Sequence, residues 1–330
     1  MGSPPVPHPD YLITLVGPGS GAGAGVPGAA VRDAATGRVI DRVPGRKDMY
    51  SAVAGTASNR LFFLTTRSTR ERAAGRDPDA GQTLPGGAFR LALNDDGTIA
   101  DLYAVPGIPE FAPDGYGITD LAATADASKL MVTSRRRRRG PPAPGAPPAE
   151  IHIVTVATGR RITWRAGSSG HVRYLSSSAD GQRMAFTQDG VGGSGVQVID
   201  LPGTVTDPVL TTPSRMVVPE HNSLGNLGPA VISADGATLY VTAAHYGPGG
   251  QPVTQLAEIS VADGQLRRIA YERHGADPAN VIFGWGPLAI DAAGQHALIA
   301  YSGNVGRIDL TTGQLTELPV EENGAFDVAW

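Results

Sequence analysis

Hydrophobic and polar residues alternate in short runs along the chain, and tight turns separate the runs. The pattern is clearest at Ser178–Phe186 (SADGQRMAF) and Ser233–Val241 (SADGATLYV), where an Asp-Gly turn precedes a second apolar stretch. Alternation with a period of two is typical of half-buried strands. Asp and Gly tolerate the positive φ angles that a hairpin turn requires. Each copy of this phrase therefore predicts two antiparallel strands joined by a tight turn.

Looser copies of the same phrase recur at Gly55–Phe63, Thr124–Val132 and Asp291–Ile299. A second phrase, with a strand on each side of a Gly-containing turn, accompanies them. It occurs at Val31–Ile40, Leu91–Ile99, Ile153–Ile162, Ile259–Leu266 and Ile308–Leu315. Together the two phrases predict a meander of four antiparallel strands, and glycine suits the left-handed turn position.

The first strand of this meander can be counted six times, near Tyr50–Ala54, Ile118–Ala123, Val172–Ser177, Pro229–Ser233, Pro287–Ile290 and Ala325–Trp330. Repetition of four-stranded units is the signature of a β-propeller. The count predicts an all-β fold of six four-stranded antiparallel blades, with seven blades as the alternative. Tyr11–Val43 supplies three strands and Phe326–Trp330 one. We expect these two ends to complete one blade, because ring closure removes free sheet edges.

Residues 11–330 are accordingly expected to form one propeller domain, and residues 1–10 a tail or linker remnant. Two insertions interrupt the repeats between a second and a third strand, Arg67–Ala88 and Arg135–Ala149 (RRRRRGPPAPGAPPA). Their composition predicts solvated loops. The five arginines could also attract an anionic lipid head group or nucleic acid.

Composition narrows the class of protein further. The 330 residues are 41% hydrophobic and include 44 Gly and 27 Pro, which fits a packed core with many turns. The formal net charge of −4 argues against nucleic acid as a partner. The absence of cysteine excludes disulfides, thiol nucleophiles and Cys-ligated metal sites. No stretch approaches the roughly 18 apolar residues of a membrane span, and Met1–Pro5 lacks the features of a signal peptide. An export or anchor segment removed from the natural protein stays an open alternative.

These phrases resemble known propeller repeats. Ser178–Phe186 and Ser233–Val241 are similar to the repeat core of TolB-type WD40-like propellers, and Val31–Ile40 is similar to the repeat of YVTN surface-layer propellers. From Tyr11 to Trp330 the chain resembles actinobacterial WD40-like and TolB-like propeller proteins, whose members often carry an N-terminal membrane anchor. The resemblance implies a bacterial protein of the cell envelope or another extracytoplasmic place, with the cytoplasm as the alternative. The Trp-Asp and Gly-His pairs of true WD40 blades are absent.

No local motif predicts a cofactor or a metal. The Gly-rich run Leu12–Gly25 imitates a dinucleotide fingerprint, but Val26–Gly28 follows and a strand is expected by Ala30, so no helix can meet a pyrophosphate. A Gly-x-Ser-x-Gly elbow and His-x-x-x-His spacing are both missing. We therefore interpret the Gly-rich run as a hairpin loop.

Loops before the first strands should converge on one mouth of the central channel and form a rim. The ligand-binding candidates on this rim are Tyr50, Tyr116, Arg173, Asn222, Trp285 and Glu322. Aromatics with charges of both signs suit a polar ligand, although a plain solvated surface has the same composition. For Tyr174 we expect packing between blades.

The main functional hypothesis is a non-catalytic propeller that binds a protein, peptide or glycan on its loop-bearing face, and we expect a monomer. Propellers place function in loops, and no catalytic cluster stands out. The alternative is a channel-mouth enzyme, namely a lyase, cyclase or lactonase-like hydrolase. Its candidate general bases are His171, His221 and His274, with Arg173 or Arg273 to hold an anionic group.

Overall fold

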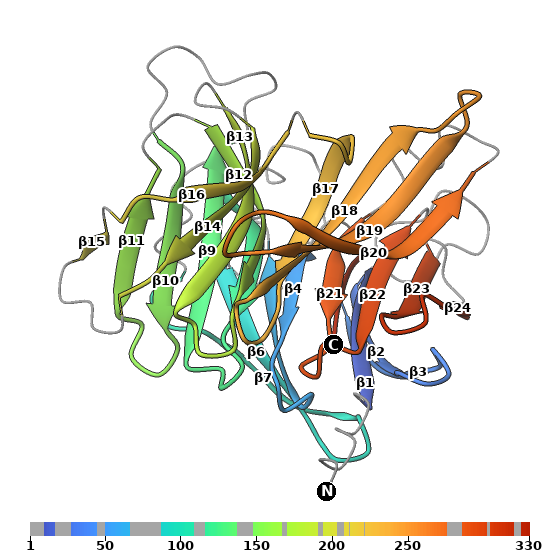
Figure 1. Ribbon diagram of the computed structural model, residues 1–330. Helices are drawn as coiled ribbons and strands as arrows, with labels where there is room; N and C mark the ends of the chain where they lie inside the picture. Colours follow the sequence, from blue (N-terminus) through green and yellow to red (C-terminus); the bar gives the residue numbers. More distant parts are fainter. Residues whose placement is uncertain are drawn as a thin grey trace, which may run out of the picture.

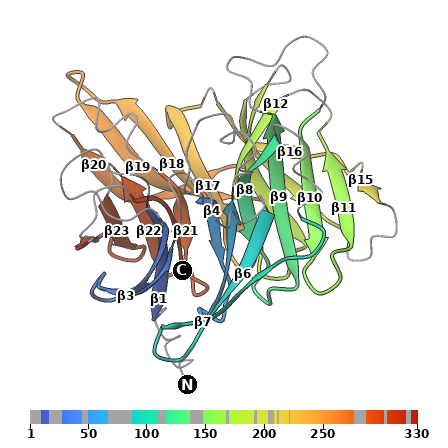
Figure 2. The ribbon, with the colours of Figure 1, turned by 180° about the vertical axis from the view of Figure 1, so that it is seen from behind.

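The computed structural model describes residues 10–16, 28–44, 50–66, 87–108, 116–136, 148–166, 170–190, 194–202, 208–210, 212–220, 222–275, 286–301, 304–319 and 325–330. In these residues the regular elements are all strands, β1 to β25. Six sheets stand around a common axis (Figure 1, and Figure 2 from behind), which confirms the six-bladed propeller. The search for a helix long and apolar enough to cross a membrane found none in this part of the chain.

The blades are numbered in chain order. Blades 1 and 2 have four strands each, and blade 3 has a fifth strand. Blade 1 consists of β25 (Ala325–Ala329), β1 (Tyr11–Val16), β2 (Gly28–Asp33) and β3 (Val39–Pro44). Blade 2 consists of β4 (Tyr50–Gly55), β5 (Leu61–Thr66), β6 (Gly87–Leu93) and β7 (Ile99–Ala104). Blade 3 consists of β8 (Tyr116–Ala123), β9 (Lys129–Arg136), β10 (Glu150–Thr155), β11 (Arg161–Arg165) and β15 (Val209–Leu210).

The other three blades each have four strands. Blade 4 consists of β12 (Gly170–Ser177), β13 (Arg183–Gly190), β14 (Gly195–Asp200) and β16 (Arg215–Pro219). Blade 5 consists of β17 (Asn226–Ile232), β18 (Thr238–Tyr246), β19 (Pro252–Ser260) and β20 (Leu266–His274). Blade 6 consists of β21 (Leu288–Ile290), β22 (His296–Tyr301), β23 (Asn304–Asp309) and β24 (Leu315–Leu318).

The ring closes through blade 1, as the sequence predicted. The C-terminal strand β25 pairs antiparallel with β1, with Thr14 opposite Val328 and Leu15 opposite Asp327. Closure gives β25 a partner on its β1 side, where a free edge would otherwise invite association. It also brings Trp330 against Gly55, where a Cβ would lie 1.7 Å from the backbone oxygen of Trp330.

The innermost strands β25, β4, β8, β12, β17 and β21 contact one another in that order around the axis. The hydrophobic core lies between neighbouring blades. Between blades 4 and 5, for example, Val196 and Val198 pack in one cluster with Val241 and Ile259. Full burial of one such side chain contributes about 1.5–3 kcal/mol. These interfaces fix the positions of the inner strands, and hence of whatever side chains face the axis.

The fifth strand of blade 3 was not predicted. β15 belongs to the connection between β14 and β16 of blade 4, and it pairs parallel with β11, with Thr163 opposite Val209 and Trp164 opposite Leu210. The buried indole of Trp164 donates a 2.8 Å hydrogen bond to the carbonyl of Thr212 in the same connection. Two residues are too few to show alternation, so the sequence carried no signal for this strand.

Both predicted insertions lie between a second and a third strand, with slightly different bounds. Ala88 belongs to β6, and Arg135 and Arg136 belong to β9. The remaining parts of the two insertions lie mostly outside the described residues.

Candidate functional site

A cavity of about 410 Å³ lies where the six innermost strands converge, and every one of these strands contributes to its wall. Alanine is the commonest residue of the wall, as at Ala54, Ala122, Ala230 and Ala289. Six strands that meet at an axis leave little room, and short side chains keep that room open. A cavity of this volume falls in the range of small-ligand sites.

One end of the cavity is ringed by the alanines of the Ser-Ala-Asp-Gly turns and their equivalents. The N–H of Ala57 donates to the carbonyl of Ala125 (3.1 Å), Ala125 donates to Ala179 (3.2 Å), and Ala179 donates to Ala234 (2.8 Å). This chain of backbone hydrogen bonds joins the turns of blades 2, 3, 4 and 5. These alanines also line the cavity, so the turn phrase both makes the hairpin and shapes the end of the channel.

Two aspartates stand near the other end, on β8 and β25. Asp327 accepts hydrogen bonds from the N–H groups of Val53 on β4 (2.8 Å) and of Val328 (2.9 Å). Asp120 accepts hydrogen bonds from the N–H groups of Leu121 (2.9 Å) and of Tyr174 on β12. Each carboxyl group thus connects its own inner strand to the inner strand of the next blade, and both aspartates line the cavity.

Burial changes the protonation of both groups. Burial raises the pKa of Asp120 to about 6, against the opposing effect of its backbone donors and of the Arg173 charge. Burial also raises the pKa of Asp327 well above its ordinary range, and the negative charge of Asp120 raises it further. Near pH 6 the two carboxyl groups therefore carry less than their full charge of −2 together, because low polarity and like charge both disfavour ionisation.

Tyr174 has an unusual backbone at this end of the cavity. Its φ is +57°, and the pairing of β12 with β13 is irregular between Arg173 and Ser176. A positive φ is uncommon for a bulky residue and is a local strain. The conformation directs the N–H of Tyr174 to Asp120, and the half-buried side chain lines the cavity. We expected Tyr174 to pack between blades, and the structure shows that its side chain also lines the cavity.

The described residues that line the cavity include three aspartates and no lysine, arginine or histidine. Asp291, the third aspartate, is 2.8 Å from Nδ1 of His296, and both side chains are buried. No group of three or more His, Cys, Asp or Glu side chains that could hold a metal ion occurs in the described part of the chain. The cavity therefore offers an apolar wall with acidic groups, and its chemistry suits binding of a partly apolar cation.

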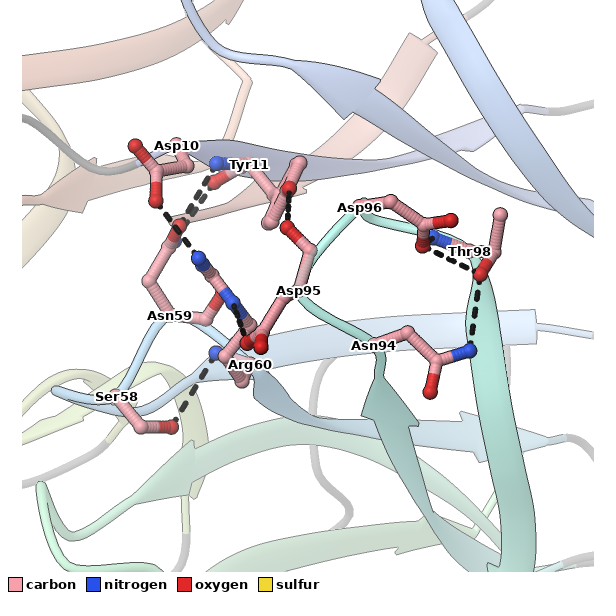
Figure 3. A network of polar contacts seen from close by, with 9 residues as sticks. All are labelled: Asp10, Tyr11, Ser58, Asn59, Arg60, Asn94, Asp95, Asp96 and Thr98. Atoms are coloured by element: carbon pink, nitrogen blue, oxygen red, sulfur yellow. Dashed lines mark hydrogen bonds and ion pairs between the residues drawn. The ribbon is translucent and has the colours of Figure 1, made fainter.

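A second polar network lies at the seam of blades 1 and 2 (Figure 3). The side chain of Asn59 accepts from the N–H of Tyr11 and donates to its carbonyl, both at 2.7 Å. Arg60 lies 2.8 Å from Asp10 and 3.8 Å from Asp95, and its guanidinium stands 4.5 Å from the ring centre of Tyr11. These contacts connect the start of β1 to the turns of blade 2, so the network holds blades 1 and 2 together.

The predicted rim residues have different environments. Tyr50 begins β4 but is only 3% exposed, and burial raises its pKa to about 12. Arg173 is exposed on β12, with its guanidinium 5.9 Å from the ring centre of Tyr174. The amide of Asn222 accepts from the N–H of Leu224 (2.6 Å) and donates to Pro219 within its own loop.

Three other rim predictions fall beyond the described part. The side chain of Tyr116, at the start of β8, lies outside it, and so do Trp285 and Glu322. Ligand binding by the six rim residues stays a prediction.

The described residues of the enzyme hypothesis lie on β12 and β20 of neighbouring blades, and their role stays a prediction. His171 lies within the innermost strand β12. Arg273 and His274 end β20, the outermost strand of blade 5. There Nε2 of His274 is 2.8 Å from Glu272, and the guanidinium of Arg273 stands 5.6 Å from the ring centre of Tyr301. His221 lies outside the described residues.

The two cavity aspartates were missed at the sequence level, although a signal existed. Each is the one charged residue in a largely apolar first strand, in Ile118–Ala123 (ITDLAA) and Ala325–Trp330 (AFDVAW). A charged residue inside a buried strand is retained only with hydrogen-bonding partners. That pattern could have singled out both positions.

Comparison with known proteins supports the fold. No protein-family model and no curated protein matches the chain. TolB from Acinetobacter baumannii is similar in structure, with a TM-score of 0.64 and 13% identity over 98% of this chain and 68% of that one. A chain of a nidogen/laminin complex has a TM-score of 0.60 and 10% identity over 97% of both chains. The β-propeller domain of Cps50 (Swd1) from Myceliophteria thermophila has a TM-score of 0.51 and 11% identity over 97% of this chain and 86% of that one. These similarities support the β-propeller fold.

Proposed function

We propose that the protein is a non-catalytic binding propeller and that its central cavity receives a slender segment of a peptide or protein partner. The observation that carries this proposal is the cavity of about 410 Å³, lined by all six inner strands. The short apolar side chains of the wall offer van der Waals contact and few hydrogen bonds. A side chain or a chain end fits such a site.

A glycan is the less suitable partner for this cavity. Sugars are recognised through many hydrogen bonds and through aromatic rings against their faces. The described wall includes three aromatic residues, Tyr174, Phe326 and Trp330, and its remaining residues are largely alanine, valine, leucine and isoleucine. An apolar wall with a few polar groups is typical of sites that hold a partly apolar ligand.

For location we propose the bacterial cell envelope. The support is the resemblance of the Ser-Ala-Asp-Gly phrases to TolB-type repeats, together with the structural similarity to TolB. Fractionation of the native host with an antibody to the propeller tests this point. Recovery with the cytoplasmic fraction would contradict it.

The binding function can be tested without knowledge of the natural partner. Random dodecapeptides displayed on phage would be selected on the whole protein, and the affinities of the selected peptides would be measured by calorimetry. Ala289→Phe places a large side chain at a half-buried position of the cavity wall. Ala100→Phe, on the exposed outer strand β7, is the matched control. We expect Ala289→Phe to weaken binding at least tenfold and Ala100→Phe to leave it unchanged.

Two outcomes would contradict the proposal. One is that the selected peptides bind the Ala289→Phe variant as tightly as the original protein, which would place their site elsewhere. The other is that the protein converts a small molecule that competes with the peptides. Circular dichroism and a thermal unfolding curve would confirm that both variants are folded.

A further inference from the structure

We infer that the group received by the cavity is a single primary ammonium on an unbranched apolar stem, as in a lysine side chain. The inference rests on the proposed function, since it names the chemistry of the same site. It follows from three features of the wall: the sign of its charges, the unused acceptor capacity of its carboxyl groups, and the width of the space between them.

The charges of the wall have one sign. Its described ionisable groups other than Tyr174 are Asp120, Asp291 and Asp327. Asp291 is paired with His296 at 2.8 Å. The other two carboxyl groups have backbone N–H donors, and no ion pair joins either of them to a Lys, Arg or His side chain among the described residues. The charge of Arg173 does lower the pKa of Asp120. A cation from a ligand would complement this charge, and a buried charge gains most from such a partner.

The acceptor capacity of the two carboxyl groups is not exhausted. An ionised carboxylate offers about four acceptor positions on its two oxygens. Asp327 uses one for Val53 and one for Val328. Asp120 likewise accepts from Leu121 and from Tyr174, and a third backbone donor, the N–H of Leu175, also lowers its pKa. Positions therefore remain for the N–H donors of a ligand, and hydrogen bonds between charged groups are stronger than neutral ones.

The repeat itself leaves space between the two carboxyl groups. They stand on β8 and β25, and β4 contacts both of these strands. On β4, Ala52 occupies the place of Asp120, since each lies four residues before the turn residue, Thr56 or Thr124. A methyl group thus lies where a third carboxyl group would otherwise stand. A compact group can enter between the flanking strands.

An ammonium fits this space better than a guanidinium. Ammonium is compact and directs three N–H donors in different directions, so it can bond oxygens on separate strands. Guanidinium is planar and prefers both oxygens of one carboxylate side by side. In Asp327 each oxygen already accepts one backbone N–H, which hinders that bidentate geometry. The alanine wall then packs against the methylene stem, as apolar surface commonly does with lysine.

Three probes of one length and different charge test the inference: hexylammonium, 1-hexanol and hexanoate. Their affinities for the whole protein would be measured near pH 7.5 by calorimetry, with nuclear magnetic resonance shifts to locate the site. We expect hexylammonium to bind at least tenfold more tightly than 1-hexanol, and hexanoate to bind more weakly than both. In the Asp120→Asn/Asp327→Asn double variant the preference for hexylammonium should fall to less than threefold. Asp101→Asn, on the outer strand β7, removes one charge outside the cavity and should change nothing.

The outcomes separate this inference from the proposed function. If 1-hexanol binds in the cavity as tightly as hexylammonium, or if the double variant keeps the preference, the inference is wrong and the cavity remains a binding site. If the probes do not bind and the selected peptides are insensitive to Ala289→Phe, both ideas are wrong. Asparagine keeps one acceptor oxygen, which can retain the hydrogen bond to the neighbouring blade at Val53 or Tyr174. Thermal unfolding would verify that the double variant folds.

Discussion

The carboxyl group of Asp327 accepts a 2.8 Å hydrogen bond from the N–H of Val53, although 274 residues separate the two along the chain. This bond links β25 to β4 and so connects the closing strand of blade 1 to blade 2 inside the ring. Asp120 makes the equivalent connection from β8 to the N–H of Tyr174 on β12. The same two aspartates line the cavity, so the groups that hold inner strands together also face the ligand site.

Replacement of Asp327 should show that the acceptor, and not the charge, stabilises the fold. Asp327→Ala leaves the N–H of Val53 buried without this acceptor, which costs about 1–3 kcal/mol. Asp327→Asn keeps an oxygen for the bond. Folding raises the pKa of the Asp327 carboxyl group. Its contribution to the free energy of unfolding is therefore complete below the pKa that this group has in the unfolded chain. The contribution is lost as the pH rises through the pKa of the folded protein.

Urea unfolding at several pH values would measure both effects. We expect Asp327→Asn to be at least as stable as the wild type at pH 7.5 and to lack this loss of stability with rising pH. Equal destabilisation by alanine and asparagine at all pH values would contradict the assignment.

The affinity for hexylammonium should depend on pH in a defined direction. Burial raises the pKa of Asp120 to about 6, so its ionised fraction increases about tenfold from about pH 5 to about pH 7. The groups that influence it are Asp327 on β25 and Arg173 and Tyr174 on β12. Calorimetry should therefore find an affinity that rises up to about tenfold over this interval, and a steady affinity for 1-hexanol. A hexylammonium affinity that is flat or falls with pH would contradict the role of Asp120.

The architecture was predictable because its signal is repeated. The Asp-Gly turns at Ser178–Phe186 and Ser233–Val241 and their three looser copies located five inner strands, and the missing fourth strand of Tyr11–Val43 identified the sixth, the closing strand. Ring closure then follows from the need to pair sheet edges. β15 was missed, since two residues that add to the edge of another blade leave no periodic trace.

The site was less predictable, because the direction in which a side chain points depends on the whole ring. Tyr50 begins a first strand as predicted, yet it is buried between blades. His274 belongs to the outermost strand of its blade. Asp120 lies in the middle of a first strand, whereas the predicted site residues were taken from the loops before these strands. Only the convergence of six strands brings it to the same cavity as Asp327.

Asn59 should be a main support of the seam between blades 1 and 2 (Figure 3). Its side chain makes two 2.7 Å hydrogen bonds with the backbone of Tyr11, and its φ is +52°. Asn59→Gly keeps the backbone conformation and loses both bonds, at a cost of about 1–3 kcal/mol. Asn59→Ala should cost about 1–2 kcal/mol more, because a left-handed conformation disfavours a Cβ. Urea unfolding of the two variants gives both differences, and equal stability of glycine and alanine would contradict the backbone argument.

Gly55 should be required for ring closure. A Cβ on this residue would lie 1.7 Å from the backbone oxygen of Trp330 and 2.9 Å from its carbonyl carbon. Backbone atoms cannot move aside as a flexible side chain can, so Gly55→Ala must shift the C-terminal residue and weaken the pairing of β25 with β1. A displaced closing strand loses burial of Val328 and Trp330, each worth on the order of 2 kcal/mol.

The expected result for Gly55→Ala is a fall in the melting temperature of several degrees, with faster amide hydrogen exchange confined to Ala325–Trp330 and Tyr11–Val16. Gly247→Ala is the matched control, since a Cβ there lies 3.1 Å from a movable methyl group of Val253 and at ordinary contact distance, 3.6 Å, from the backbone oxygen of Gln251. This variant should exchange like the wild type. Unchanged amide hydrogen exchange of both terminal strands in Gly55→Ala would contradict the prediction. It would show that ring closure does not require a glycine opposite Trp330.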